Sequence, residues 1–292
     1  MDTIRSWLIA PANRPKQIAK FATLNADVST LDLEDGTPPS DKDSARDSIA
    51  KQIADLRAAG MKGKIYVRLN DPASGRIEAD LKASLDAKVD GVVIPKVATL
   101  DDVRRIAMEI AEAERRMSRS FGIIAGIESA RGVMNVQSIA FGDSHLVGLY
   151  FGAEDFATDL WGARRTPEST EVLYARSRVV LAAKGARINA IDQAVLAVHD
   201  DAFFTIECEF ARNLGYDGIV CLNPRQAELA NKLFSPTAAE VDYSLRLLSA
   251  ADEAEHDGRG VIAFEGKMVD GPLIKRAQRI VSVGRQSGIS VV

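Results

Sequence analysis

Eight short apolar runs follow one another along most of the chain, and each is followed by a helix or a helix-rich connection. Such runs are typical of strands buried on both faces of a parallel sheet, with the helices as crossovers. The strands are predicted at residues 5–10, 28–34, 64–69, 91–95, 121–127, 146–151, 188–192 and 218–222. Eight βα units predict an α/β fold, a TIM (β/α)8 barrel, with an open doubly wound sheet as the alternative.

Two of the predicted helices have recognisable start signals. Ser40 is predicted to cap the first, with Asp43 three residues later as a helper acid. Thr99 and Asp102 repeat this arrangement before the second helix. The apolar faces that would pack on the sheet are Ala45, Ile49, Ile53 and Leu56 in the first helix, and Leu100, Val103, Ala107 and Ile110 in the second.

The last part of the chain has a different pattern. A long helical stretch follows Pro236, then come a short apolar run and a Glu265-Gly266 turn, and another helix ends the chain. We therefore divide the chain into a catalytic barrel domain at residues 1–235 and a C-terminal helical extension at residues 236–292. Extensions of this kind often contact another protomer, so we expect this one to pack on a neighbouring subunit.

Charge and cysteine usage narrow the class of protein. The net charge of −4 gives no reason to expect binding to nucleic acid or to an anionic membrane. The two cysteines, Cys208 and Cys221, lack metal-ligand spacing, which favours a reduced intracellular protein. No apolar run approaches the roughly 18 residues of a membrane helix, and the start of the chain, with Asp2 and Arg5, does not resemble a signal peptide. We expect a cytoplasmic protein.

Acidic residues follow three of the predicted strands. Glu128 and Asp155 each end an apolar run, and Glu34 and Asp35 end the second strand. Because parallel strands end at one rim, these four carboxylates should meet there. At about 6 Å and an effective dielectric near 20, each close pair costs roughly 3 kcal/mol, so the rim needs a cation, a proton or basic partners. Carboxylate oxygens favour Mg²⁺, with Mn²⁺ as a substitute. The alternative, helix capping or pairing with Arg, suits Asp35 and Glu154 best.

Basic and backbone groups complete the predicted rim. Arg68 and Lys96 also end strands, and the strand-to-helix turn at Gly152 offers backbone N–H groups to a substrate carboxylate. This set suits 2-hydroxy or 2-keto acids, which chelate a metal through a carboxylate and a second oxygen. The metal would polarise the carbonyl, and Arg68 would stabilise the oxyanion. The natural reaction is cleavage or formation of a carbon–carbon bond beside a carbonyl.

Short segments spread over nearly the whole chain resemble one known family. In chain order they are RSWL (5–8) with PA (11–12), LDLED (31–35), RLN (68–70), PK (95–96), IESARG (127–132), GAED (152–155), AID (190–192), NPRQ (223–226) and GKMVD (266–270). Together they resemble the citrate lyase beta-subunit-like proteins, which include malyl-CoA and citramalyl-CoA lyases and belong to the HpcH/HpaI aldolase group. The resemblance implies a TIM barrel with a C-terminal extension, in trimers or hexamers.

The resemblance also implies roles for individual residues. Glu128 and Asp155 would be the Mg²⁺ ligands, and Arg68 would bind the keto-acid carbonyl and stabilise the enolate. Asp270 would be the acid/base at the thioester methyl group, delivered from a neighbouring subunit. Glu34 and Asp35 would order metal-bound waters. Gly152, Ala153 and Glu154, at the turn described above, would bind the substrate. The basic residues Arg14, Lys16 and Lys20 would contact the CoA phosphates, although an exposed helix face is an equally good interpretation of these three.

The chain departs from the family pattern at two places. Asn223-Pro224 stands where the family often has His-Pro, and Glu265-Gly266 stands where it often has Asp-Gly. An Asn side chain cannot titrate, so a proton-transfer role at position 223 is lost, which favours a specialised substrate. His145 and His199 lie outside the matched segments, and we interpret both as surface or loop residues.

These observations predict a Mg²⁺-dependent carbon–carbon lyase. It would cleave a 3-hydroxyacyl-CoA of the citramalyl-CoA, malyl-CoA or citryl-CoA type to acetyl-CoA and a 2-keto acid. One alternative is a CoA-independent class II aldolase acting on a hydroxy-keto acid, and another is a non-catalytic subunit of a lyase complex.

Overall fold

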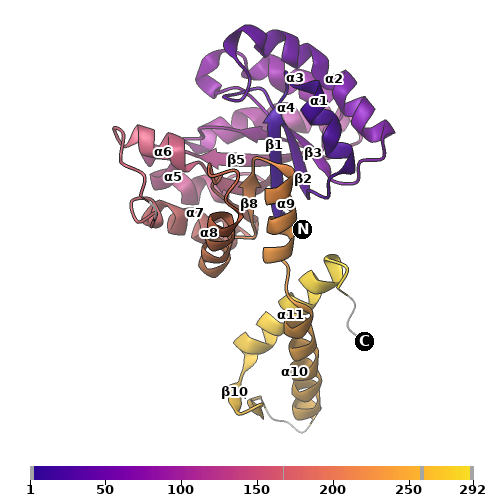
Figure 1. The fold of residues 1–292 in the computed structure, drawn as a ribbon, viewed down its shortest axis with the longest axis vertical. Coiled ribbons are helices and arrows are strands. Elements are labelled where there is room, and N and C mark those ends of the chain that lie inside the picture. The colour runs from indigo at the N-terminus through magenta and orange to yellow at the C-terminus, as the bar shows by residue number, and fades with distance from the viewer. Residues whose placement is uncertain (1–2, 167, 257–259, 290–292) are drawn as a thin grey trace. The chain divides into compact units, whose positions relative to one another are not determined.

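The computed structural model describes residues 3–166, 168–256 and 260–289, and it divides into two compact units at Asn231/Lys232. Within the described part of the first unit, eight parallel strands close into a barrel in sequence order, with β1 paired to both β2 and β8 (Figure 1). The strands are β1 (Ser6–Pro11), β2 (Val28–Asp32), β3 (Lys64–Arg68), β4 (Gly91–Ile94), β5 (Gly122–Ile127), β6 (Leu146–Phe151), β7 (Asn189–Asp192) and β8 (Gly218–Cys221). The predicted TIM barrel is confirmed.

Helices follow the strands around the barrel. Their bounds are α1 (Pro15–Ile18), α2 (Lys42–Ala58), α3 (Ile77–Asp86), α4 (Leu100–Met117), α5 (Ala130–Ala140), α6 (Ala153–Asp159), α7 (Leu173–Ala186), α8 (Asp201–Leu214) and α9 (Pro224–Leu233), with 3₁₀ turns at Ala19–Thr23, Pro39–Asp41 and Pro72–Ser74. None of the helices in the described ranges is both long and apolar enough to cross a membrane.

The start signals of α2 and α4 have different outcomes. In α4 the predicted capping box is present, since the Asp102 carboxylate accepts the Thr99 backbone N–H at 2.8 Å. In α2 the predicted cap at Ser40 is wrong, because Ser40 lies inside a 3₁₀ turn and Asp41 occupies the N-cap position. Pro39 begins that turn, so the chain is already coiled before the helix starts.

The barrel interior is filled by side chains, and glycines make room for the largest of them. Trp7 and Tyr150 meet edge to face, with ring centroids 4.8 Å apart. Gly126 is the register partner of Tyr150 on the next strand, and a Cβ at Gly126 would lie 2.6 Å from the Tyr150 ring. A filled interior is typical of this barrel, which therefore offers its ligand space at the rim where the strands end.

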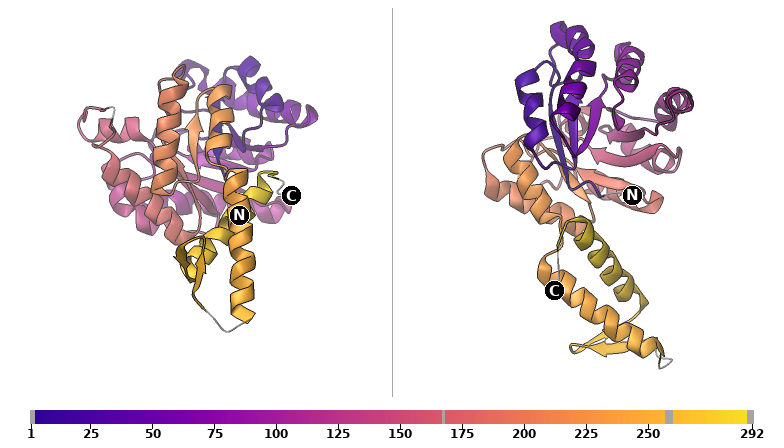
Figure 2. Two further views of the ribbon diagram at one scale, coloured as in Figure 1. Left: turned by 60° about the horizontal axis from the view of Figure 1, so that its bottom comes forward. Right: turned by 90° about the vertical axis from the view of Figure 1, so that its right-hand side faces the viewer.

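The second unit is a helical hairpin with a small sheet. It contains α10 (Ala238–His256), the antiparallel strands β9 (Ile262–Phe264) and β10 (Lys267–Val269), and α11 (Gly271–Gln286). The two helices lie side by side (Figure 2). Their contact is close at Gly284, where a Cβ would lie 2.6 Å from Val241.

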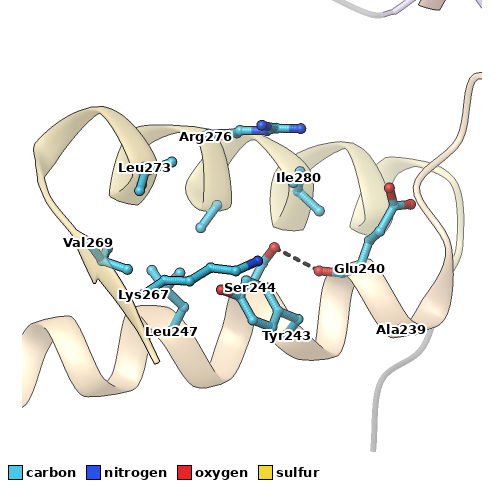
Figure 3. A pocket seen from close by; sticks show the side chains of 11 residues that line it. Ala239, Glu240, Tyr243, Ser244, Leu247, Lys267, Val269, Leu273, Arg276 and Ile280 are labelled. Atoms are coloured by element: carbon cyan, nitrogen blue, oxygen red, sulfur yellow. Dashed lines mark hydrogen bonds between the residues drawn. The ribbon is translucent and has the colours of Figure 1, made fainter. Parts of the chain in front are cut away.

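An open groove with a volume of about 450 Å³ runs between α10 and α11. Figure 3 shows apolar side chains on both of its walls, among them Leu247 and Leu273, and the Lys267 side chain reaching across it. Ser244 in its floor donates to the Glu240 carbonyl at 2.7 Å. The predicted packing of this unit on a neighbouring subunit stays a prediction.

Candidate active site

Arg68 ends β3 and is held by two carboxylates that follow or end β2. Asp32 is its register partner, and the two Asp32 oxygens accept Nε–H and Nη2–H of Arg68, both at 2.7 Å. The Nη1 of Arg68 lies 2.9 Å from Oε2 of Glu34. Among the described residues, Asp32 and Glu34 thus take three of the five N–H donors of the Arg68 guanidinium. Its side chain is 15% exposed, so the other donors can serve a ligand at the rim.

The Arg68–Asp32 pair is strongly coupled. Burial acts to lower the pKa of Arg68, but the charge of Asp32 and its hydrogen bonds raise it well above the usual value. Burial likewise acts to raise the pKa of Asp32, and Arg68 together with backbone N–H donors holds it below the usual value. Both groups are therefore charged at neutral pH, and a fixed cation stands at the end of β3.

Lys96 follows β4 and touches each of the four predicted acids. Its Nζ lies 2.8 Å from Glu34, 3.5 Å from Asp35 and 3.6 Å from Asp155. Its backbone N–H donates to Oε1 of Glu128 at 3.2 Å. Lys96 also has a positive φ of 52°, which is uncommon outside glycine and is often found at functional sites. The structure therefore brings the four acids together around one residue, three of them at its ammonium group and Glu128 at its backbone N–H.

The Glu128 carboxylate lies in a space left by two glycines. A Cβ at Gly126 would lie 2.3 Å from Oε1 of Glu128, and a Cβ at Gly152 would lie 2.6 Å from its Cγ and 2.9 Å from its carboxyl carbon. Real Cβ atoms do not approach other atoms this closely. Glycine at both positions is therefore required for the Glu128 side chain to take its place between β5 and β6.

The charge state of Glu128 is set by its surroundings. Burial raises its pKa, the nearby charges of Glu34 and Asp155 raise it further, and the pKa reaches about 8. The hydroxyl of Tyr150 donates to the same carboxylate and acts in the opposite direction. At neutral pH Glu128 therefore carries a proton, which relieves the repulsion among the acids.

Asp155 lies in the first turn of α6, which begins directly after Gly152. Gly152 does not offer its N–H to a ligand, because that group already donates to the Ile127 carbonyl at 3.1 Å. Ala153 is buried, and the Glu154 carboxylate pairs with Arg165 at 3.0 Å. The predicted binding of a substrate carboxylate by the backbone N–H groups of this turn stays a prediction in which the Gly152 N–H takes no part, and Glu154 takes the alternative of pairing with Arg.

The donor set fits a hard divalent cation. No group of three His, Cys, Asp or Glu side chains suited to a metal occurs in the residues that the structure describes. Mg²⁺ does not need one, since it commonly takes one or two carboxylates and fills its other positions with water and substrate oxygens. Glu128 and Asp155 supply two such carboxylates, and their charge is balanced by a proton and the Lys96 ammonium, which a divalent cation can replace.

Other predicted site residues lie apart from this cluster. Arg14 precedes α1, and Lys16 and Lys20 are exposed in or just after it, in the connection that leaves the C-terminal end of β1. Asp270 belongs to the second unit, where it is the exposed N-cap residue of α11. Its delivery to the barrel rim stays a prediction.

The Asn223 side chain hydrogen-bonds to backbone groups at the position where the family often has histidine. Its Nδ2 donates to the Val198 carbonyl at 2.8 Å, and its Oδ1 accepts the Gln226 N–H at 2.9 Å at the start of α9. His145 lies in the turn before β6, at the opposite end of the barrel from the acids, and His199 is exposed in a turn. None of these three side chains lies among the acids.

Two residues of the cluster received no role from the sequence. Asp32 lies two residues before Glu34, so the two side chains share one face of the strand, and this position directs Asp32 to its register partner Arg68. Tyr150 lies in the apolar run before Asp155, and its signal is the glycine at the matching position of the preceding strand. A large residue beside a glycine of the neighbouring strand indicates a side chain that leans over that strand.

Comparisons with known proteins point the same way. The family described as HpcH/HpaI aldolase/citrate lyase matches residues 5–224. The citrate lyase subunit beta-like protein of Deinococcus radiodurans is 39% identical over 281 residues, covering 96% of each chain. The mitochondrial citramalyl-CoA lyase of Rattus norvegicus is 31% identical over 291 residues, covering 96% of this chain and 85% of that one. A structure of CitE from Mycobacterium tuberculosis with magnesium, acetoacetate and coenzyme A is 28% identical, covers 98% of each chain and has a TM-score of 0.77.

Proposed function

The chain belongs to the HpcH/HpaI aldolase/citrate lyase family, and from this premise we propose that it is a Mg²⁺-dependent lyase acting on a CoA thioester. Its substrate would be a 3-hydroxyacyl-CoA of the citramalyl-CoA, malyl-CoA or citryl-CoA type, and its products acetyl-CoA and a 2-keto acid. The observation that carries this proposal is the cluster of Glu34, Asp35, Glu128 and Asp155 around Lys96, beside the Arg68 guanidinium. The magnesium, acetoacetate and coenzyme A in the related CitE structure support it.

Glu128 and Asp155 would hold the metal. When bound, Mg²⁺ supplies a Lewis acid for the oxygens of the keto-acid part of the substrate. Glu34 and Asp35 also contact the Lys96 ammonium, and they would order water at the rim. Glu128 must lose its proton to act as a ligand, and the neighbouring Tyr150 hydroxyl then stabilises its charge.

Arg68 would act on the substrate oxygen. In cleavage, the hydroxyl proton leaves to a base, and the oxygen becomes the carbonyl of the keto acid as the bond between C2 and C3 of the acyl chain breaks. The electron pair of that bond passes to the thioester as an enolate. The N–H donors of Arg68 that remain free of Asp32 and Glu34 would stabilise the negative charge on the oxygen.

Asp270 would complete the reaction by protonating the enolate carbon, which becomes the methyl group of acetyl-CoA. General acid catalysis of this kind is typically worth about 10²–10⁴ in rate. Because the resemblance places this residue on a neighbouring subunit, we propose that the enzyme works as a homo-oligomer. Arg14 and Lys16 would contact the CoA phosphates from the connection after β1.

Proton exchange at the methyl group of acetyl-CoA tests this function. The wild type should exchange these protons with solvent when Mg²⁺ and the matching keto acid are present, among pyruvate, glyoxylate and oxaloacetate. Glu128→Ala and Asp155→Ala should abolish exchange and metal binding, while Glu112→Ala, an exposed acid on α4, should leave both unchanged. Full exchange in either site variant, with metal chelated, would refute the metal role. Aldol cleavage of free hydroxy-keto acids without any acyl-CoA activity would favour the CoA-independent aldolase.

A further inference from the structure

Arg165 lies in the connection between α6 and α7 and binds three separate segments. Its Nε donates to the Glu154 carboxylate on α6 at 3.0 Å, and its Nη2 donates to the Gln193 side chain just after β7 at 2.9 Å. Its Nη1 donates to the Glu171 carboxylate shortly before α7. Every nitrogen of one guanidinium is thus committed to a different part of the chain.

The Gln193 contact continues into a buried network of charges. Gln193 is 3% exposed, and its Nε2 donates to the Glu207 carboxylate on α8 at 3.1 Å. Glu207 lies 3.3 Å from Arg176, which in turn pairs with Asp192 at the end of β7. Arg176 and Asp192 are fully buried, so this network has little freedom to move. Arg165 is therefore anchored to the interior of the barrel wall.

The helix that Arg165 holds is short and carries a proposed metal ligand. α6 has seven residues, and Asp155 is the third of them. An isolated helix of this length is not stable in water, so its position depends on outside contacts. In the middle of α6, Phe156 makes an edge-to-face pair with Phe151, and at its C-terminal end Asp159 accepts the Ala130 N–H at 2.7 Å. At its first turn the side-chain anchor is Glu154 on Arg165.

From this arrangement we propose that Arg165 is a positioning residue, which fixes the first turn of α6 and so sets the place of Asp155 at the metal site. The inference rests on the proposed function for the role of Asp155. Arg165 contacts neither the acids of the cluster nor the proposed substrate-binding site next to Arg68. Its effect passes through Glu154, the residue before Asp155.

The geometry requires arginine at this position. The guanidinium is a planar fork with five N–H donors, whereas the lysine ammonium is a single point charge. A lysine at 165 has its donors on a single nitrogen and cannot reproduce the three separate positions, Nε, Nη1 and Nη2, from which Arg165 reaches its partners. The charge alone is therefore insufficient, and Arg165→Lys should fail to restore what Arg165→Ala loses.

Metal affinity and amide exchange test the proposal together. Partners that orient metal ligands typically change metal affinity about 10–100-fold when removed. We expect Arg165→Ala and Arg165→Lys each to weaken Mn²⁺ binding by a factor in this range and to speed hydrogen exchange across residues 153–166. Arg164→Ala is the matched control, because this neighbouring exposed arginine has no ion-pair partner in the part of the chain that the structure describes. It should change neither readout.

A substitution at Gln193, the buried partner of Arg165, tests the same proposal from within the barrel wall. Gln193→Leu would remove both the oxygen that accepts from Arg165 and the donor to Glu207, and it should speed exchange in α6 while leaving every residue of the acid cluster in place. Wild-type Mn²⁺ affinity in Arg165→Lys, whether or not exchange is faster, would overturn the proposal. If Arg165→Ala does not fold, Arg165→Lys and Gln193→Leu decide.

The two proposals fail in different ways. If the wild type itself binds no Mn²⁺, the metal site is refuted, and the exchange data alone decide whether Arg165 fixes α6. If the wild type binds Mn²⁺ and the Asp155→Ala variant does not, but the Arg165 variants bind Mn²⁺ as tightly as the wild type, the positioning role is refuted and the metal site stands.

Discussion

Gly152 offers a direct geometric test of the metal site. An added Cβ would lie 2.6 Å from Cγ and 2.9 Å from the carboxyl carbon of Glu128. Carbon atoms in favourable contact are about 3.5–4.0 Å apart, so the Glu128 side chain would have to retreat by about 1 Å. The backbone itself accepts alanine, since Gly152 has a φ of −97°. The cost therefore falls on the carboxylate and not on the turn.

The magnitude follows from this displacement. A shift of about 1 Å in a reacting group can cost about 10² in rate, and overpacking a filled site costs typically 1–3 kcal/mol of stability. We expect Gly152→Ala to lower kcat by about 10² and to weaken Mn²⁺ binding by about 10–100-fold, as for other changes that misplace a ligand.

The assay pairs Mn²⁺ titration and methyl-proton exchange with thermal unfolding, which separates local from global damage. Gly148→Ala in β6 is the control, because the nearest atom to a Cβ there is the Asn189 carbonyl oxygen at 3.3 Å, which has to shift by only a few tenths of an ångström. A folded Gly152→Ala protein with wild-type Mn²⁺ affinity and wild-type exchange would show that the Glu128 carboxylate does not act from its observed position.

Three further outcomes are expected. Asp270→Asn and Glu128→Ala should each be inactive alone. If Asp270 comes from a neighbouring subunit, oligomers reassembled from a 1:1 mixture of the two dissociated variants should be active at about a quarter of their sites, because half of the chains keep Glu128 and half of their neighbours keep Asp270. Mn²⁺ affinity should rise with pH towards about 8, because burial and neighbouring charges raise the pKa of Glu128 to about 8 and its protonated form cannot ligate. The pKa of Asp32 is lowered, so its stabilising pair with Arg68 is present above the unfolded pKa of about 3.9 and is lost as pH falls through the folded value. Asp32→Asn should therefore cost about 3–5 kcal/mol at neutral pH and flatten the acid limb of the stability curve measured by urea unfolding.

The barrel could be predicted because its signal is local and repeated. Each strand is an apolar run whose length and composition suit burial on both faces, and the run that ends at Ile127 was placed to within one residue. The meeting of Glu128 and Asp155 followed from topology alone, since parallel strands end at one rim. The start of α2 was missed because Pro39 adds a 3₁₀ turn that the spacing of Ser40 and Asp43 does not reveal.

The contacts among side chains could not be read from the sequence. Whether Glu154 faces the rim or Arg165 depends on the path of the connection between α6 and α7, which has no periodic pattern. The bond from Tyr150 to Glu128 depends on the register of β5 and β6, which contains an irregularity between Ile123 and Ile124. Such contacts join residues far apart in the chain, so no local signal encodes them.

The charge balance of the rim gives the proposed metal a second role. While Glu128 is protonated, four other carboxylates face two cations, Arg68 and Lys96, which leaves the rim with a net negative charge. A keto acid or a hydroxyacyl chain brings a further carboxylate, and like charges at close range cost several kcal/mol each. A divalent cation offsets most of this charge before the anion arrives, because five carboxylates, Glu128 now included, then face four positive charges. The same acids that favour the metal therefore disfavour an anionic substrate in its absence, and we expect the metal to bind before the substrate.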